Sequence, residues 1–478
     1  MADQHPPAVP APTLTPVTEP IPAAPEEVPA SLSDTDFADY VNQSSFMQEG
    51  SWIVVQMPSS NTKIVQLKGN TTINLGKFGN FRSRDLVGMP FDMPYEIHGD
   101  KEVKPATDLH SLDAFDIETE EGASNKDLID RRESQRLSQF EIEEMKKQSL
   151  KGGLDTETMI KALLENSDTF DNKTEFAKAK YIKRKQKKYS KIFIPRRPSA
   201  RTLCNHFSQD NPRKINEMRI DTLSQMLTTA NIRPNGRYIV IDEAGGLLTC
   251  ALAERLQGRG TIFVIHDHDV YNADLVKYLN FPADLPNVVR TLAWTRLEKN
   301  GDEDFETMTF ECPDPDKIER LRKRVMRIRK ERTYLQAGGF DGLLVISQYK
   351  NDEIIQRLAP YLAGSSPVVA YSVHKETLTP TFTHLRTSPS FTNAQLTESW
   401  LREYQVLAGT HPMMRMSGSG GYLVSALVTR VQEGLVTHAA TSRYKGGKRK
   451  GGEEGGRGKK RRGEEVGQGP EGEGYVEG

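Results

Sequence analysis

The sequence of 478 residues has only three cysteines, Cys204, Cys250 and Cys312, and none of them forms a Cys-x-x-Cys pair. This spacing supports neither a disulfide framework nor a zinc site, and it fits a reducing compartment. No apolar run approaches the roughly 18–20 residues of a membrane-spanning helix. The first residues lack the basic start and the apolar centre of a secretory signal. We therefore expect a soluble intracellular protein with no membrane segment and no bound metal.

Neither sign of charge dominates, because 64 Lys and Arg nearly balance 65 Asp and Glu. The information lies instead in blocks of biased composition. Residues 1–45 are rich in proline and poor in bulky side chains, and residues 438–478 are mainly Gly, Lys, Arg and Glu. Such segments bury too little apolar surface to fold, so we predict that both tails are disordered. The clusters KGGKRK and GKKRR in the second tail are typical of a nuclear-localisation signal or a loose nucleic-acid contact.

Residues 46–99 contain short β-rich runs separated by Pro, Gly and Asn, namely SWIVVQM, TKIVQL, TTINLGKFGNF and YEIHG. Strands of this length and spacing predict a small antiparallel β-barrel. The acidic residues 100–124 that follow are interpreted as a linker.

Residues 125–194 have a helical pattern and are predicted to form a basic connector. Ser138 and Glu141 have the spacing of a capping box, and a Gly-Gly pair is expected to end the helix that begins there. Two further helices are expected at about 156–165 and 172–190.

After Pro195, apolar strands alternate with helical segments; the strands are RYIVID, GTIFVIHD, NVVRTLAW, DGLLVIS and SPVVAYS. This alternation predicts a parallel sheet with helices on both faces. Near the end, REYQVLAGT and GYLVSALVTRV are expected to pair antiparallel and close the sheet, as strands do in many methyltransferase folds. The predicted class is α/β, with residues 195–437 forming a doubly wound, methyltransferase-like (Rossmann-type) domain.

The first of these strands leads into an incomplete nucleotide-binding loop, IVIDEAGGLLT. Glycines let such a loop turn tightly and approach its ligand, and an intact methyltransferase loop usually reads Gly-x-Gly-x-Gly. Here Glu243 is followed by only Gly245 and Gly246, and the loop is about three residues too short. Leu247 and Leu248 would fill the space that a cofactor needs. We therefore expect a degenerate loop that binds no cofactor.

The ends of the next strands supply no other cofactor-binding or catalytic residues. The sequence HDHD at 266–269 offers a carboxylate for a ribose, but side chains along a strand alternate between faces, and no third metal ligand is visible. The sequence SQY at 347–349 contains no carboxylate and no proline where many base methyltransferases carry an acidic or amide residue before an apolar-Pro motif. No general base is evident, so we expect no catalytic residue in this chain.

Positive charge concentrates in KAKYIKRKQKKYSK, residues 178–191, which contains two tyrosines and no acid. Unbroken positive charge is expected where phosphates are neutralised, and tyrosines can stack on unpaired bases. A solvated helix face is the alternative interpretation, although such faces usually mix both signs. The candidate RNA-binding residues are Lys178, Lys180, Lys183, Arg184, Lys185, Lys187 and Lys188.

A second basic helix is predicted at KIERLRKRVMRIRKER, residues 317–332. Ile318, Leu321, Val325 and Ile328 would form one stripe that packs on the sheet, while nine Lys and Arg cover the rest. The polar outer face of an ordinary sheet-covering helix and an RNA contact explain this pattern equally well.

Several long blocks resemble the family of non-catalytic subunits of the tRNA adenine-58 N1-methyltransferase. TTINLGKFGNF and LVGMPFDMPYEI resemble the N-terminal barrel of that family. The other similar blocks are KTEFAKAKYIKRKQKKY, RIDTLSQMLTTANIRPNGRYIVIDEAGGLLTCALAERL, LTESWLREYQVL and HPMMRMSGSGGYLVS. They occur in order across about residues 46–435, apart from the acidic loop near 300–316.

This resemblance implies a chain that is paralogous to its catalytic partner and shares its fold but not its cofactor pocket. It implies a nuclear complex of two chain types, a heterotetramer, which methylates N1 of an adenine in the T loop of tRNA. S-adenosylmethionine would be bound by the partner chain. The resemblance places Lys183, Arg184, Lys185, Lys187 and Lys188 on the tRNA-contacting side.

The resemblance also places Arg415, Ser417, Gly418 and Gly420 near the interface between the two chain types, where they would support the partner's pocket. Two other functions remain open. One is an active S-adenosylmethionine-dependent RNA methyltransferase with an unusual loop, and the other is a stand-alone RNA-binding translation factor.

Overall fold

The computed structural model describes the chain in eleven stretches, and several predictions fall outside them. The described residues are 45–99, 101–106, 135–150, 156–170, 173–268, 270–281, 288–297, 315–405, 410–414, 416 and 418–430. Apart from Ser45, the two predicted disordered tails lie outside these residues, as does most of the predicted acidic linker. The chain divides into two units at Arg430, and every described residue belongs to the first unit.

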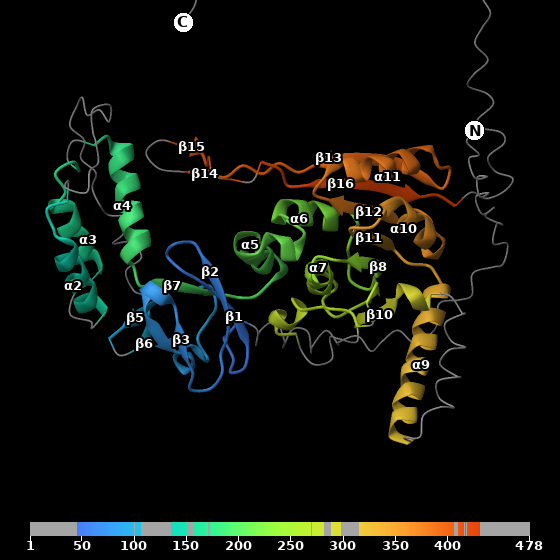
Figure 1. Cartoon of the computed structure of the whole chain (residues 1–478), viewed down its shortest axis with the longest axis horizontal. Coiled ribbons are helices and arrows are strands. Elements are labelled where there is room, and N and C mark those ends of the chain that lie inside the picture. The colour runs from blue at the N-terminus through green and yellow to red at the C-terminus, as the bar shows by residue number, and fades with distance from the viewer. Residues whose placement is uncertain are drawn as a thin grey trace, which may run out of the picture. The chain divides into compact units, whose positions relative to one another are not determined.

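The N-terminal part is an antiparallel β-domain (Figure 1). Five strands form one sheet in the order β2-β1-β7-β5-β6, and every neighbouring pair is antiparallel. Their bounds are Trp52–Gln56 for β1, Thr62–Gln66 for β2, Tyr95–His98 for β5, Glu102–Pro105 for β6 and Ile192–Arg196 for β7. Strands β3, Thr72–Asn74, and β4, Asn80–Arg82, form a separate antiparallel pair. Alternating residues such as Ile53 and Val55 are fully buried in the core of this domain.

This domain extends beyond the predicted boundaries of 46–99. Strand β6 lies in the predicted acidic linker, and β7 spans the end of the predicted helical connector, yet both belong to the sheet. Strand β7 is inserted between β1 and β5, and its Phe193 stacks on Phe81 with ring centroids 4.8 Å apart. Pro195 made this segment a poor strand candidate, because proline cannot donate a ladder hydrogen bond. The long-range pairing of β7 is what places it in the sheet.

Three helices precede β7, close to the predicted positions. They are α2, Gln139–Leu150, α3, Thr156–Glu165, and α4, Glu175–Tyr189. The predicted capping box at the start of α2 is confirmed, because the Ser138 backbone N–H donates to the Glu141 carboxylate at 2.7 Å and the Glu141 N–H donates to the Ser138 hydroxyl at 3.3 Å. Buried Ile160 and Leu164 of α3 pack against Ile182 of α4.

The C-terminal part contains a seven-stranded sheet in the order β10-β9-β8-β11-β12-β16-β13. The five strands from β10 to β12 are parallel, and β16 is antiparallel to both of its neighbours. The strands are β8, Arg237–Asp242; β9, Thr261–His266; β10, Val289–Ala293; β11, Gly342–Ile346; β12, Pro367–Ser372; β13, Phe391–Glu398; and β16, Tyr422–Val428. The predicted doubly wound, methyltransferase-like sheet is confirmed by this topology.

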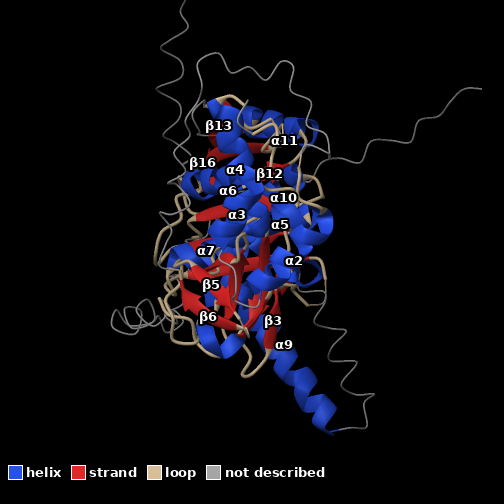
Figure 2. Cartoon of the chain, turned by 90° about the vertical axis from the view of Figure 1, so that its left-hand side faces the viewer, coloured by secondary structure: helices blue, strands red, loops and turns tan. Residues whose placement is uncertain are grey.

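Helices cover both faces of this sheet (Figure 2). On β8, Tyr238 and Val240 face one core cluster, and Ile239 and Ile241 face the other, as the alternation of side chains along a strand requires. The first cluster includes helices α5, Ala200–Asp210; α6, Ile220–Thr229; and α7, Leu247–Leu256. The second includes α9, Pro315–Gln336; α10, Asn351–Leu358; and α11, Lys375–Thr387. No helix within the described residues is long and apolar enough to cross a membrane.

We predicted that GYLVSALVTRV pairs with REYQVLAGT to close the sheet, and the second of these segments was the wrong partner. Strand β16 lies in the predicted GYLVSALVTRV segment, but it pairs with β13 and not with REYQVLAGT. Within REYQVLAGT, Tyr404–Gln405 forms β14 and pairs with β15, His411–Pro412. Strand β13 has the sequence FTNAQLTE and lies at the sheet edge, where a polar strand is tolerated because one side of it faces solvent. Its polarity concealed it in the sequence.

The prediction for the second basic helix also needs correction. Helix α9 packs on the sheet only near its C-terminal end, where Arg332, Tyr334 and Leu335 are buried and Ile328 contacts the core. The rest of the expected apolar stripe is only partly buried; its members are Ile318, Leu321 and Val325.

Candidate functional site

The loop between β8 and α7 is closed by the chain's own backbone. Gly245 and Gly246 have positive φ angles of 65° and 91°, a region that favours glycine. A Cβ atom on Gly246 would lie 3.1 Å from the Cα of Ala273, and one on Gly245 would lie 3.1 Å from the carbonyl oxygen of Lys214. The Leu275 N–H donates to the Gly245 carbonyl at 3.3 Å. The glycines thus admit neighbouring protein backbone at the point where a nucleotide-binding loop would admit its ligand.

The carboxylate of Asp242, at the end of β8, is turned inward. It accepts hydrogen bonds from the Ala244 N–H at 3.0 Å, the Thr249 N–H at 2.8 Å and the Thr249 hydroxyl at 2.9 Å. The Tyr271 hydroxyl lies 3.4 Å from the same carboxylate. Burial raises the pKa of Asp242, although these hydrogen bonds oppose the shift. Asp242 therefore holds the start of α7 in place, which is a structural role.

Leu247 and Leu248 do not fill a cofactor space, contrary to the sequence prediction. Both belong to the first turn of α7 and are fully buried in the core. The contacts that close the loop come from Tyr271 and Ala273, which lie more than twenty residues further along the chain. No local sequence signal identifies them, because their role depends on how the segment after β9 folds back onto the loop.

Glu243 links the loop to the end of β11. Its carboxylate accepts the Ser347 hydroxyl and the Gln348 N–H, each at 2.8 Å. The Tyr349 hydroxyl donates to Asp267 at 3.2 Å, and this hydrogen bond is the main cause of the raised pKa of Tyr349. The polar residues at three strand ends therefore bind one another. Among the described residues there is no group of three or more His, Cys, Asp or Glu that could hold a metal ion.

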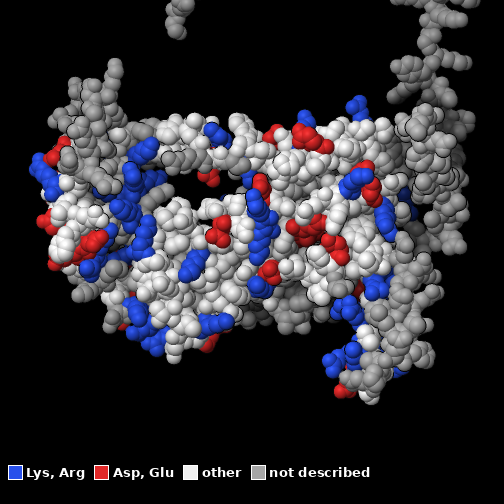
Figure 3. All heavy atoms as spheres, viewed as in Figure 1, with Lys and Arg blue, Asp and Glu red and all other residues white. Residues whose placement is uncertain are grey.

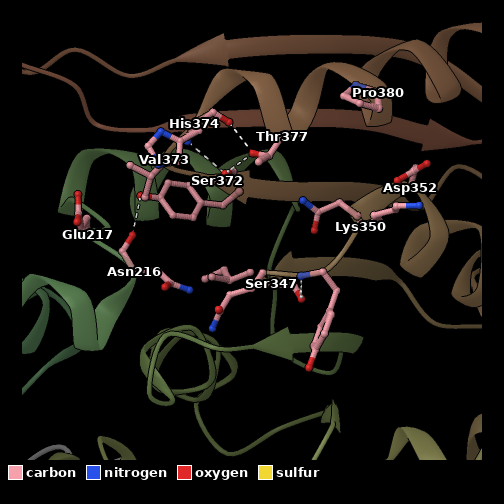
Figure 4. A pocket seen from close by; sticks show the side chains of 15 residues that line it. Asn216, Glu217, Ser347, Lys350, Asp352, Ser372, Val373, His374, Thr377 and Pro380 are labelled. Carbon is pink, nitrogen blue, oxygen red and sulfur yellow. Dashed lines mark hydrogen bonds between the residues drawn. The ribbon is translucent and has the colours of Figure 1, made fainter.

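Two hollows flank the end of β11 at the carboxyl edge of the sheet, where open α/β sheets bind their ligands. One, of about 600 Å³, lies beside the closed loop and is lined by Asp242, Glu243 and Asp267 among others. The other, of about 680 Å³, lies at the ends of β11 and β12 (Figure 4). In Figure 4 the Ser372 and Thr377 hydroxyls bond to each other at 2.6 Å, so these lining groups also satisfy one another. The residues present do not form an intact site for S-adenosylmethionine, because the Gly246 part of the loop, which would hold the methionine moiety, is packed on Ala273.

Helix α4 carries all seven predicted RNA-binding residues, and it presents several of them to solvent. Figure 3 shows Lys and Arg side chains gathered over this helix. The exposed members are Lys180, Lys183, Arg184 and Lys188. Lys185 is half-buried, with its ammonium 4.9 Å from the ring centroid of Tyr181. Lys187 lies within the helix, but its side chain is outside the described part of the structure.

Two parts of the RNA prediction for α4 need correction. Lys178 is only 7% exposed, with its ammonium 5.9 Å from the ring centroid of Phe170, so it supports the helix packing and does not face solvent. The tyrosines are not free to stack on bases. Tyr181 packs against Phe170 with ring centroids 5.7 Å apart, and Tyr189 is 9% exposed in a cluster with Met159. Their spacing in the sequence reflects a helix that buries one face.

The predicted partner-interface residues are only partly described. Gly418 is exposed, whereas Gly420 is buried. The Gly420 carbonyl accepts the Thr222 hydroxyl at 2.6 Å, and a Cβ on Gly420 would lie 2.5 Å from the Ser399 hydroxyl oxygen. Gly420 thus has a packing role inside this chain. Arg415 and Ser417 lie outside the described residues.

The sheet order and the glycine loop together define a methyltransferase-like protein whose loop lacks the Gly-x-Gly-x-Gly pattern. The family model of the Gcd10p family matches residues 46–322, and the chain belongs to this family. This confirms the resemblance seen in the sequence blocks.

The curated relatives bear consistent names. The tRNA (adenine(58)-N(1))-methyltransferase non-catalytic subunit trm6 of Schizosaccharomyces pombe is 30% identical over 459 residues, covering 87% of this chain and 97% of that protein. The protein of the same description from Mus musculus is 33% identical over 370 residues, covering 64% of this chain and 74% of that protein. Among solved structures, the tRNA (m1A58) methyltransferase TrmI from Aquifex aeolicus is 10% identical with a TM-score of 0.42, covering 81% of this chain and 100% of that chain.

Proposed function

We propose that this chain is the non-catalytic, tRNA-binding and scaffolding subunit of a tRNA methyltransferase complex. The complex forms 1-methyladenosine at position 58 in the T loop of tRNA, and its catalytic chain binds the S-adenosylmethionine. The two chain types are paralogues and assemble as a heterotetramer. The names of the family relatives support the substrate and the division of labour.

One observation carries the assignment of a non-catalytic role: the glycine loop after β8 is packed against the chain's own backbone. Gly246 contacts Ala273 and Gly245 contacts Lys214, so a bound methionine moiety would have to displace backbone. The neighbouring carboxylates of Asp242 and Glu243 already accept hydrogen bonds from protein groups. A methyl transfer in this chain would therefore lack both its donor site and a poised base.

The charge on α4 supports the tRNA-binding part of the proposal. Lys183, Arg184 and Lys188 are exposed on one short helix whose opposite side is anchored by Ile182 and Tyr189. A fixed array of cations neutralises phosphates and releases counterions, which gives sequence-independent affinity for RNA. Such an array suits a subunit that must hold many different tRNAs.

The test is to purify this chain, its catalytic partner and the assembled complex, and to measure both cofactor binding and tRNA methylation. We expect isolated chain to bind S-adenosylmethionine no tighter than about 100 μM, or about 5.5 kcal/mol. The complex should bind one cofactor per catalytic chain, and methylation should require both chain types. Tight binding by this chain alone would favour an active methyltransferase. Failure to assemble with a methyltransferase-like chain would favour the stand-alone translation factor.

We also propose that the complex acts in the nucleus. The basic clusters KGGKRK and GKKRR in residues 438–478 support this localisation, because compact Lys/Arg clusters are typical nuclear-import signals.

A further inference from the structure

Helix α9 differs from the other helices of the sheet domain, because only its C-terminal end packs against the core. It contains nine Lys or Arg but only three Asp or Glu, so the acids of the helix are too few to neutralise all of its cations. One of the three acids, Glu319, pairs with Lys323 at 3.5 Å on the exposed surface. A helix that only covered a sheet would bury its apolar stripe along its whole length. The exposed cationic part of α9 therefore calls for a function of its own.

The C-terminal end of α9 is anchored by arginines that the sequence pattern did not single out. Arg290 of β10 forms a two-oxygen contact with Glu331, at 3.2 Å to each carboxylate oxygen, and both side chains are nearly buried. The Arg290 guanidinium also lies 4.2 Å from the ring centroid of Tyr334. Buried Arg332 donates from Nε to the Arg296 carbonyl at 2.8 Å. These contacts hold the C-terminal end of α9 rigidly against the sheet.

A hollow of about 270 Å³ lies between α9 and the carboxyl ends of β9 and β10. Arg324 and Arg327 line it from the helix, and Arg296 and His266 line it from the sheet side. The one acid among the residues that line it is Glu331, whose carboxylate is held by Arg290. The hollow therefore has a net positive lining next to a rigid wall.

Because of the helical repeat, some arginines of α9 line the hollow and others point away from it. Arg324 and Arg327 are three residues apart, so they lie on the same side of the helix and both line the hollow. Arg322 and Arg329 are also exposed, but they do not line it. Blue side chains along α9 are visible in Figure 3.

We propose that this hollow, the α9 groove, binds phosphate groups of the RNA backbone and forms a second tRNA contact separate from α4. The proposal rests on the proposed function, since tRNA is the ligand. Guanidinium groups present planar, paired N–H donors that match phosphate oxygens, and arginine keeps its charge at all physiological pH values. Three arginines that converge on a small hollow can hold one or two phosphates. Tyr271 also lines the hollow, but its hydroxyl is hydrogen-bonded to Thr249 at 2.6 Å, which fixes the ring within the protein.

The test compares two double variants of the full chain, each assembled with the catalytic partner. The groove variant is Arg324→Gln with Arg327→Gln, and the matched control is Arg322→Gln with Arg329→Gln. Both remove two charges from exposed positions of the same helix, so net charge and helix propensity change equally. Binding of a tRNA transcript is measured at several salt concentrations.

We expect the groove variant to weaken tRNA binding on the order of tenfold and to reduce the slope of log affinity against log salt by roughly 1.4–1.8, at 0.7–0.9 per lost phosphate contact. The control should change affinity less than twofold. A third variant, Arg324→Lys with Arg327→Lys, should keep most of the salt slope while losing part of the affinity, because lysine keeps the charge but not the paired donors.

Equal losses in the groove variant and the control would overturn the proposal, because α9 would then act only through net charge. An unchanged affinity in the groove variant would also overturn it, and would leave the acidic segment near 300–316 as the natural counter-charge of α9. The α4 variants described below separate this result from a failure of the proposed function. If they weaken tRNA binding and the groove variant does not, α4 is the tRNA contact and the α9 groove is not.

Discussion

The polar side chains of the loop after β8 are hydrogen-bonded within the protein, whereas those of helix α4 are mostly exposed to solvent. In the loop, Asp242 and Glu243 accept hydrogen bonds from neighbouring protein groups, and Gly246 packs closely against the backbone of Ala273. On α4, Lys183 and Arg184 remain exposed, while the apolar side of the helix holds them in place. The comparison shows that the carboxylates at the end of β8 serve the packing of the methyltransferase-like sheet, whereas the exposed cations of α4 are available to a partner. Variants of the loop and of α4 should therefore have different effects, the first on stability and the second on tRNA binding.

The largest expected effect is the loss of the buried carboxylate of Asp242. Asp242→Ala leaves two backbone N–H groups and the Thr249 hydroxyl without their acceptor, so the free energy of unfolding should fall by about 2–4 kcal/mol. Chemical denaturation of the isolated chain measures this change. Cofactor binding by the assembled complex should be unaffected wherever the variant is folded. A stable variant that abolishes methylation would instead give Asp242 a functional role.

Neutralising α4 should have the next largest effect. Changing Lys183, Arg184 and Lys188 to alanine should weaken tRNA binding by the complex on the order of tenfold to a hundredfold, since exposed cations contribute through counterion release. The salt slope should fall by roughly 2–3, and alanine preserves the helix. Binding is measured by titration at several salt concentrations.

The control for this variant changes Arg255, Lys375 and Arg386 to alanine, since all three are exposed on helices α7 and α11. It removes the same number of charges away from α4. Equal slopes and affinities for the α4 variant and wild type would show that α4 is only a solvated face.

A smaller effect is expected in the pH dependence of stability. Burial raises the pKa of Asp242 in the folded state above its ordinary value of 3.8, so the folded chain binds a proton at this site more readily than the unfolded chain. This stabilising contribution is complete below the ordinary value and is lost as pH rises through the folded pKa. Relative to Asp242→Asn, wild type should therefore become less stable as pH rises through that range and level off above it. A difference that stays flat with pH would contradict the shift.

The smallest effect on the folded protein should come from deleting residues 441–478. This segment holds the two basic clusters and contains no periodic apolar residues that would predict a packed element. We expect unchanged unfolding and nearly full methylation in vitro, with a loss of nuclear enrichment in cells observed by fluorescence microscopy. Retained nuclear accumulation would remove the localisation role from these clusters.

The sequence predicted the parts of this molecule that depend on local pattern. The parallel strands, the capping box at Ser138 and Glu141 and the shortened glycine loop all have signals within a few residues. Features set by distant contacts were missed. Strand β13 is polar because it lies at an edge, and the burial of Lys178 and Tyr189 depends on helices that pack from elsewhere in the chain. Ala273 has no signal of its own, since only the folded backbone brings it to Gly246.

The central position of β7 has a consequence for how the protein is made. Strands β1 and β5 each need β7 as a neighbour, but it is translated roughly 100 residues after β5. At ribosomal speeds of about 5–20 residues per second, two strand edges stay unpaired for about 5–20 s. Unpaired edges invite association with other chains. The antiparallel domain can therefore complete its sheet only once the basic helix α4 has been synthesised.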